Sequence, residues 1–131
     1  MAEETLVEGF ITDAIKLIDA LDKQGDNPTR AVWYYFSDAE KWQLVLAGPS
    51  FDQFLSTDQN QAYLKVATAI TQANVDSISI ADVKLMRTDD KLLQATKYVI
   101  KTSPNSVVRA LFRDSTINGI FVKEMLVLRA A

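Results

Sequence analysis

The stretch "RAVWYYFSDAEKWQLVLAGP", residues 30–49, decides the fold because it predicts a β-hairpin. Two runs of apolar and aromatic residues, 30–36 and 41–47, flank a short polar turn, as antiparallel strands do. The register set by this turn pairs Tyr35 with Trp42, Trp33 with Leu44, and Ala31 with Leu46. We expect these six residues to form the core face of the hairpin, where cross-strand aromatic pairs are stabilising.

The opposite face of this hairpin is too apolar to be left in water. Either a second layer of the same chain covers it, or a protein partner does. We expect a partner surface, made of the four apolar residues Val32, Tyr34, Phe36 and Val45. Stacking of nucleic-acid bases on the aromatic residues is disfavoured, because only Arg30 and Lys41 supply positive charge nearby.

Before the hairpin, residues 4–25 predict an amphipathic helix. Thr5 and Glu8 have the spacing of a capping box at its start, and Gly25 is suited to its end. The predicted apolar stripe consists of Leu6, Phe10, Ile11, Ala14, Ile15, Leu17, Ile18 and Leu21.

After the hairpin, residues 47–54 predict a connection rich in turns, and residues 56–74 a helix capped by Ser56 with Gln59. A strand is expected at 82–87, with Val83 and Leu85 on one face. A third helix is expected at 88–102, capped by Thr88.

The last segment, residues 106–131, predicts a long hairpin turning at Asn118-Gly119, a pair that favours a tight type I′ turn. Counting outward from the turn pairs Ile117 with Ile120, Asp114 with Lys123, Arg113 with Glu124, and Leu111 with Leu126. The final strand is apolar on both faces, so we expect it to lie centrally in the sheet.

These segments predict a single α+β domain over residues 1–131, in the order α-β-β-α-β-α-β-β. The expected sheet has five largely antiparallel strands, covered by about three helices. The helix at 88–102 joins two strands and could act as a crossover, so a mixed sheet is also possible.

Composition excludes several chemistries. The 131 residues include no cysteine and no histidine, which removes disulfides, thiol catalysis and histidine-based triads. No apolar run is long enough to span a membrane, and the acidic N-terminus does not resemble a secretory signal. We therefore expect a cytoplasmic protein that needs no cofactor.

Charge is distributed unevenly along the chain. Residues 1–27 carry a net charge of −5, residues 28–76 carry −2, and residues 77–131 carry +4. This pattern indicates either an acidic helix facing a basic sheet or an anion-binding C-terminal half. The total of −3 is too acidic for a typical nucleic-acid-binding domain.

Arg109, Arg113 and Ser115 would share one face of a strand and could bind a carboxylate or phosphate. Cross-strand ion pairing explains the two arginines more simply. This group is nevertheless the candidate site for a small anionic ligand.

Metal-dependent hydrolysis is the least favoured activity. Asp82, Asp89 and Asp90 could ligate a divalent cation, but adjacent acids at a helix start usually serve as caps. Asp114 and Glu124 each face a basic residue in the predicted hairpin, and a nuclease would need more convergent acids.

The stretches "VWYYFSDAEKWQLVLAGP" and "STINGIFVKEMLVLR", with the N-terminal helix, resemble small bacterial proteins of unknown function. That resemblance implies a bacterial, cytoplasmic origin and no activity. The sequence therefore favours a non-enzymatic protein-interaction or accessory module that forms homo-oligomers. The alternative is a domain that binds a small molecule or anion through Arg109 and Arg113.

Overall fold

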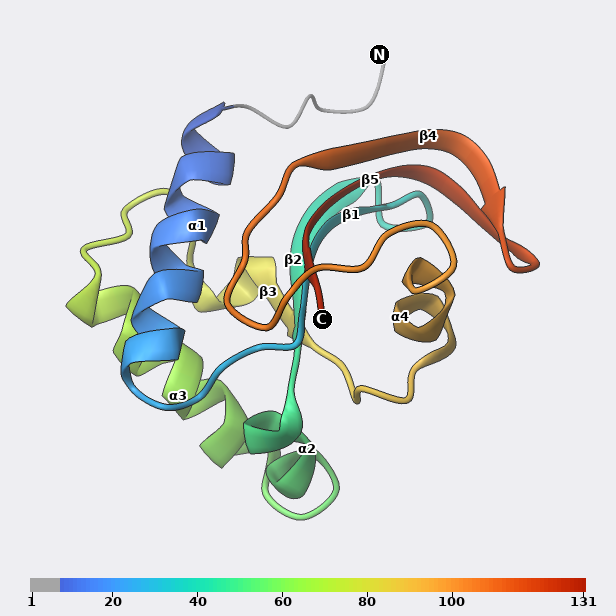
Figure 1. Ribbon diagram of the computed structural model, residues 1–131. Coiled ribbons are helices and arrows are strands. Elements are labelled where there is room, and N and C mark those ends of the chain that lie inside the picture. Colours follow the sequence, from blue (N-terminus) through green and yellow to red (C-terminus); the bar gives the residue numbers. More distant parts are fainter. Residues whose placement is uncertain (1–7) are drawn as a thin grey trace.

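The computed structural model describes residues 8–131, from a long helix to the longest strand (Figure 1). The elements in chain order are α1 (Glu8–Lys23), β1 (Arg30–Phe36), β2 (Lys41–Ala47), α2 (Pro49–Leu55), α3 (Gln59–Gln72), the short 3-10 helix η1 (Ile80–Asp82), β3 (Val83–Leu85), α4 (Lys91–Thr96), β4 (Ala110–Ile117) and β5 (Ile120–Ala130). The capping box predicted for Thr5 and Glu8 rests on Thr5, which lies outside the described residues.

The five strands form one sheet in the order β3-β2-β1-β5-β4. Every neighbouring pair is antiparallel except β2 with β3, so the sheet is mixed and mostly antiparallel. The predicted α+β class and five-stranded sheet are confirmed, with four α-helices in place of about three. The central place expected for the last strand is also confirmed, since β5 lies between β1 and β4.

Both predicted turns set the register that was expected. The β1–β2 pairing joins Tyr35 with Trp42 and Trp33 with Leu44, and the β4–β5 pairing joins Ile117 with Ile120. Asn118 and Gly119 have φ values of 48° and 83°, as a type I′ turn requires.

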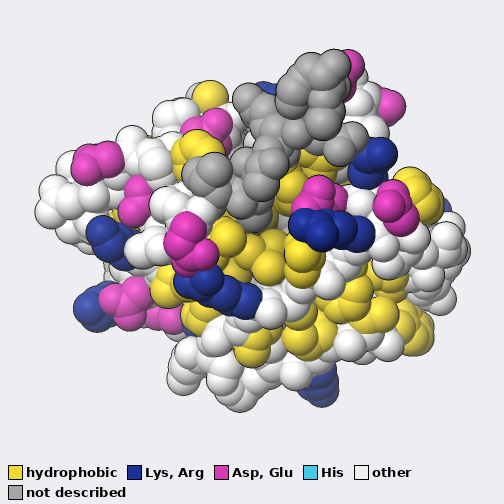
Figure 2. Space-filling model, turned by 90° about the horizontal axis from the view of Figure 1, so that it is seen from above, with side chains coloured by type: hydrophobic (Ala, Val, Ile, Leu, Met, Phe, Trp, Pro, Cys, Tyr) yellow, Lys and Arg dark blue, Asp and Glu magenta, His cyan; other side chains and the backbone are white. Residues whose placement is uncertain are grey.

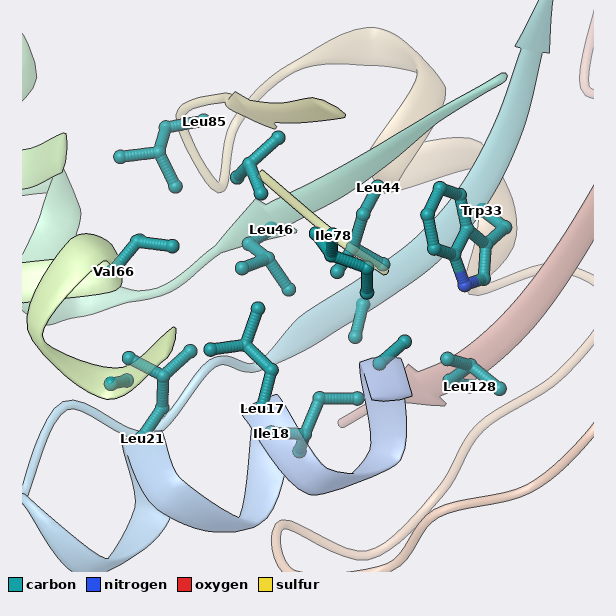
Figure 3. Packing of buried hydrophobic residues seen from close by; sticks show 14 of the residues in the cluster. Leu17, Ile18, Leu21, Trp33, Leu44, Leu46, Val66, Ile78, Leu85 and Leu128 are labelled. Carbon is teal, nitrogen blue, oxygen red and sulfur yellow. The ribbon is translucent and has the colours of Figure 1, made fainter. Parts of the chain in front are cut away.

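One face of the sheet packs against α1 and α3 and forms the first core (Figure 3). Leu17, Ile18 and Leu21 of α1 point toward Leu44 and Leu46 of β2. The aromatic face of the first hairpin lies here as predicted, because Trp33, Tyr35 and Trp42 belong to the same cluster. The rings of Tyr35 and Trp42 meet edge to face, with centroids 5.6 Å apart.

The other face of the sheet forms a second core with α4. Leu92, Leu93 and Ala95 of this helix belong to one buried cluster with Val32 of β1 and Met125 of β5. The sheet is therefore covered on both faces over its central strands, and a second layer of the same chain reaches the outer face of the first hairpin.

The turn-rich connection predicted at 47–54 is wrong, because α2 occupies most of it. Pro49 stands at the first position of this helix, where its missing N–H is not needed. Phe51 anchors the helix in the first core with no exposed surface. Gly48 precedes it where a Cβ atom would lie 2.8 Å from the carbonyl oxygen of Asn27.

Three later elements are shorter than predicted, and the two helices among them have other caps than predicted. The helix expected at 56–74 is α3, preceded by Asp58, so the cap of Ser56 with Gln59 is wrong. The strand expected at 82–87 is β3, in which Val83 and Leu85 are both buried in the first core as predicted.

The helix expected at 88–102 is α4, and its cap is Asp90, whose Oδ1 accepts a hydrogen bond from the Leu92 N–H at 2.9 Å. Thr88 does not cap it, because its N–H and hydroxyl both donate to the carboxylate of Asp52. The helix ends at Thr96, which is fully buried and whose hydroxyl donates to the carbonyl oxygen of Leu93.

At Asp114 the regular alternation of side chains between the two faces of the second hairpin is interrupted. Its φ is 45°, and Phe112 before it and Ile117 after it both contact the second core. Regular alternation would place residues five apart on opposite faces. The alternation is also interrupted in β5, because Val122 and Met125 are three residues apart and both contact the second core. Beyond Asp114 the hairpin curls over α4 (Figure 1).

Candidate functional site

β1 and β5 separate at the end of the sheet where the second hairpin curls away. Their pairing ends at Tyr34 with Met125, although β1 continues to Phe36 and β5 starts at Ile120. The separation leaves a hollow of about 200 Å³ between the end of β1 and the start of β5. We call this hollow the aromatic notch, defined by Tyr34, Phe36 and Phe121 with Lys123.

The aromatic notch presents large apolar rings to solvent. Phe121 is 60% exposed, while Tyr34 and Phe36 are half-buried. The rings of Tyr34 and Phe36 meet edge to face, with centroids 4.7 Å apart. The Nζ atom of Lys84 lies 5.4 Å from the centroid of Phe36, close enough for a cation–π contact. These contacts hold the aromatic rings in place before anything binds.

Burial raises the pKa of the Tyr34 phenol above its ordinary value. A phenol is protonated at neutral pH with its ordinary pKa as well, so the Tyr34 hydroxyl can act as a hydrogen-bond donor at the notch. An apolar ring with a polar tip is the chemistry that protein interfaces favour.

Two of the four predicted interface residues, Val32 and Val45, do not line the aromatic notch. Val32 and Val45 are fully buried in the second core, so neither can contact a partner in this fold. The prediction is wrong for these two, because α4 covers the part of the sheet face that they occupy. Tyr34 and Phe36, at the end of β1, pack against the same core but stay half-buried.

The three residues predicted to bind an anion do not form one site. Arg113 donates from Nε to Glu124 at 3.0 Å, which is the cross-strand pair predicted from the turn. Ser115 donates its hydroxyl to the carbonyl oxygen of Arg113. Arg109 bonds to Glu8 of α1 at 2.7 Å and lines a different hollow.

That hollow is a groove between α1 and residues 105–109, with a volume of about 400 Å³. We call it the α1 groove. Asp22 and Arg129 line it, joined by two hydrogen bonds of 2.9 Å each. The side chain of Arg129 is only 1% exposed, which makes this a largely buried ion pair.

The three aspartates considered as metal ligands each make another interaction. Asp82 accepts hydrogen bonds from Ser79, Asp89 pairs with Arg87, and Asp90 caps α4. Within residues 8–131, no three acidic side chains gather in a way that could hold a metal ion.

Sequence reasoning missed Phe121 and Arg129. Phe121 stands two residues after Gly119 of the second turn. The sequence did not indicate that the alternation of side chains would be interrupted at Asp114. Arg129 did leave a signal, because an arginine inside an apolar central strand requires a buried acidic partner. The sequence did not indicate that Asp22 would be this partner.

Comparison with protein-family models, with curated proteins and with solved structures finds no match to this chain. The resemblance to small bacterial proteins therefore stays a prediction. In the part of the chain that the structure describes, no helix is both long and apolar enough to cross a bilayer.

Proposed function

We propose that this protein is a non-enzymatic interaction module that binds a protein partner at the aromatic notch. The exposure of Phe121 beside Tyr34 and Phe36 carries this proposal. Aromatic residues contribute most of the binding energy in many protein interfaces, because they bury large apolar areas at low entropic cost.

The partner that we propose first is a second copy of the chain. Leu111 is 49% exposed on β4, an edge strand of the sheet, and extends the apolar surface of the second hairpin. Figure 2 shows hydrophobic side chains gathered among acidic and basic side chains on the face seen from above. A self-association surface of this kind would keep these side chains from water. We propose a cytoplasmic location for the assembly, in keeping with the absence of cysteine.

Light scattering coupled to gel filtration tests the proposal over the micromolar concentration range. We expect the wild type to form dimers and Phe121→Ser to shift the population to monomers. Leu64→Ser is the matched control, because Leu64 is 57% exposed on α3, away from the notch.

A wild type that stays monomeric would reject self-association. Equal loss of dimer in Phe121→Ser and Leu64→Ser would reject the notch as its site. Circular dichroism of both variants establishes that neither substitution acts by unfolding the domain.

A further inference from the structure

We propose that the α1 groove binds a small organic anion with an apolar body. The groove lies away from the aromatic notch and is lined by different residues, so this inference does not rest on the proposed function. Its volume of about 400 Å³ falls within the usual range for small-molecule sites.

The walls of the α1 groove are apolar and held firmly. Ile15 of α1 and Val107 line it with partly exposed side chains, above the fully buried Ile18. The loop that carries Val107 is fixed to β5, because the N–H of Val108 donates to the carbonyl oxygen of Leu128 at 2.8 Å. These side chains supply a surface for a short hydrocarbon body.

The acidic side chains of the groove are already bound to cations. Asp22 uses both carboxylate oxygens on Arg129. Asp19 pairs with Lys23 at 2.9 Å on the outer surface of α1. The carboxylate of Asp22 is therefore unavailable to a cationic ligand, whereas Asp19 can exchange its exposed partner as Arg109 can. The groove lining thus offers one exchangeable acid, Asp19, against two exposed basic groups, Lys16 and Arg109.

Two of the basic side chains, in contrast, keep donors at the surface. That of Arg129 does not, because it is only 1% exposed. Arg109 bonds to Glu8 through a half-exposed surface pair, which contributes little and can be exchanged for a ligand. The Nζ atom of Lys16 lies 3.8 Å from a carboxylate oxygen of Asp13, a long ion pair.

Two exposed cationic groups, Lys16 and Arg109, thus border an apolar hollow whose floor is the buried pair of Asp22 and Arg129. Arg129 gives the site a fixed element, since its guanidinium is held by Ser106, Pro28 and Asp22 before any ligand arrives. Guanidinium groups bind carboxylates and phosphates through the same acceptor oxygens. The chemistry common to the expected ligands is therefore an anionic oxygen group on a short apolar chain.

Isothermal titration calorimetry with hexanoate and hexyl phosphate tests the site and distinguishes carboxylate from phosphate ligands. Hexylamine and hexan-1-ol have the same apolar chain with a positive or a neutral head group. We expect at least one of the two anions to bind more tightly than the amine and the alcohol. Failure of both anions to bind, or equal binding of hexylamine, would overturn the proposal.

The variants Arg109→Gln and Lys16→Gln locate the binding site. Each should weaken anion binding by about tenfold, equivalent to about 1.4 kcal/mol. Arg113→Gln is the matched control, because it removes a charge from the same strand region outside the groove. If Arg109→Gln and Lys16→Gln lose no more affinity than Arg113→Gln, the anion does not bind in the α1 groove.

Discussion

Asp22 of α1 holds Arg129 of β5 through two parallel hydrogen bonds, from Nη1 and Nη2, each 2.9 Å long. The guanidinium also donates to the carbonyl oxygens of Ser106 and Pro28, so one side chain joins three segments distant in sequence. The pair lies at the floor of the α1 groove and ties the first helix to the centre of the sheet.

Removing the acid from this pair should be costly. We expect Asp22→Ala to lower the free energy of unfolding by about 3–5 kcal/mol, because it leaves a buried charge without a partner. Asp19→Ala, which breaks only a surface pair on the same helix, should cost less than about 1 kcal/mol. Urea unfolding followed by circular dichroism measures both. Similar values for the two variants would contradict the structural role assigned to Asp22.

Gly48 should be intolerant of a side chain. A Cβ atom there would meet the backbone of Asn27 at 2.8 Å, and the neighbouring Pro28 cannot easily move. We expect Gly48→Ala to lower the free energy of unfolding by about 1–3 kcal/mol. The control is Gly9→Ala in α1, where a Cβ atom meets nothing within 4 Å and should be neutral or slightly stabilising. Thermal unfolding that ranks Gly48→Ala above Gly9→Ala would refute the packing argument.

Asp13 should make stability depend on acidic pH. The hydroxyl and the N–H of Ser77 both donate to its carboxylate, at 2.6 and 3.0 Å, and hold its pKa below the ordinary value of 3.8. A carboxyl with a lowered pKa in the folded state stabilises the fold above its unfolded-state pKa. This contribution is lost as the pH falls through the folded-state value.

Replacing Ser77 tests this dependence. In Ser77→Ala we expect the pKa of Asp13 to rise toward 3.8 and the loss of stability below that pH to be smaller. NMR titration of the Asp13 carboxyl gives the first quantity, and urea unfolding at a series of acidic pH values gives the second. An unchanged Asp13 titration in Ser77→Ala would show that the hydrogen bond from the Ser77 hydroxyl does not lower the pKa.

Asp114 should accept glycine and reject valine. Its φ of 45° is in the left-handed region, which costs non-glycine residues about 1–2 kcal/mol. We expect Asp114→Gly to be neutral or stabilising and Asp114→Val to be destabilising, since branched side chains fit this backbone worst. Chemical unfolding of the two variants gives the comparison. A valine variant as stable as the glycine variant would argue against a fixed backbone bend at this position.

The hairpin registers were predictable because turn chemistry acts locally. Asn118 and Gly119 adopt positive φ, and the pairing of Arg113 with Glu124 follows by counting. The core face around Trp33 follows from alternation in the same way. These features depend on neighbouring residues alone, which a single sequence contains.

Features that depend on distant contacts were not predictable. The start of α2 is stabilised by the burial of Phe51, and α4 ends at the fully buried Thr96. Val32 is fully buried in the second core, whereas Tyr34 on the same face of β1 packs against that core and stays half-buried. The candidate site changed for this reason, from a flat hairpin face to a notch at its end.

The central position of β5 has a consequence for synthesis of the chain. A ribosome produces β1, β2 and β4 before β5, yet β1 and β4 reach one another only through β5. The nascent polypeptide therefore carries an unclosed sheet, with Val32 lacking its neighbour Val127, until the last of these strands has been translated. Sheet closure must come late, and long-range pairing of this kind slows folding.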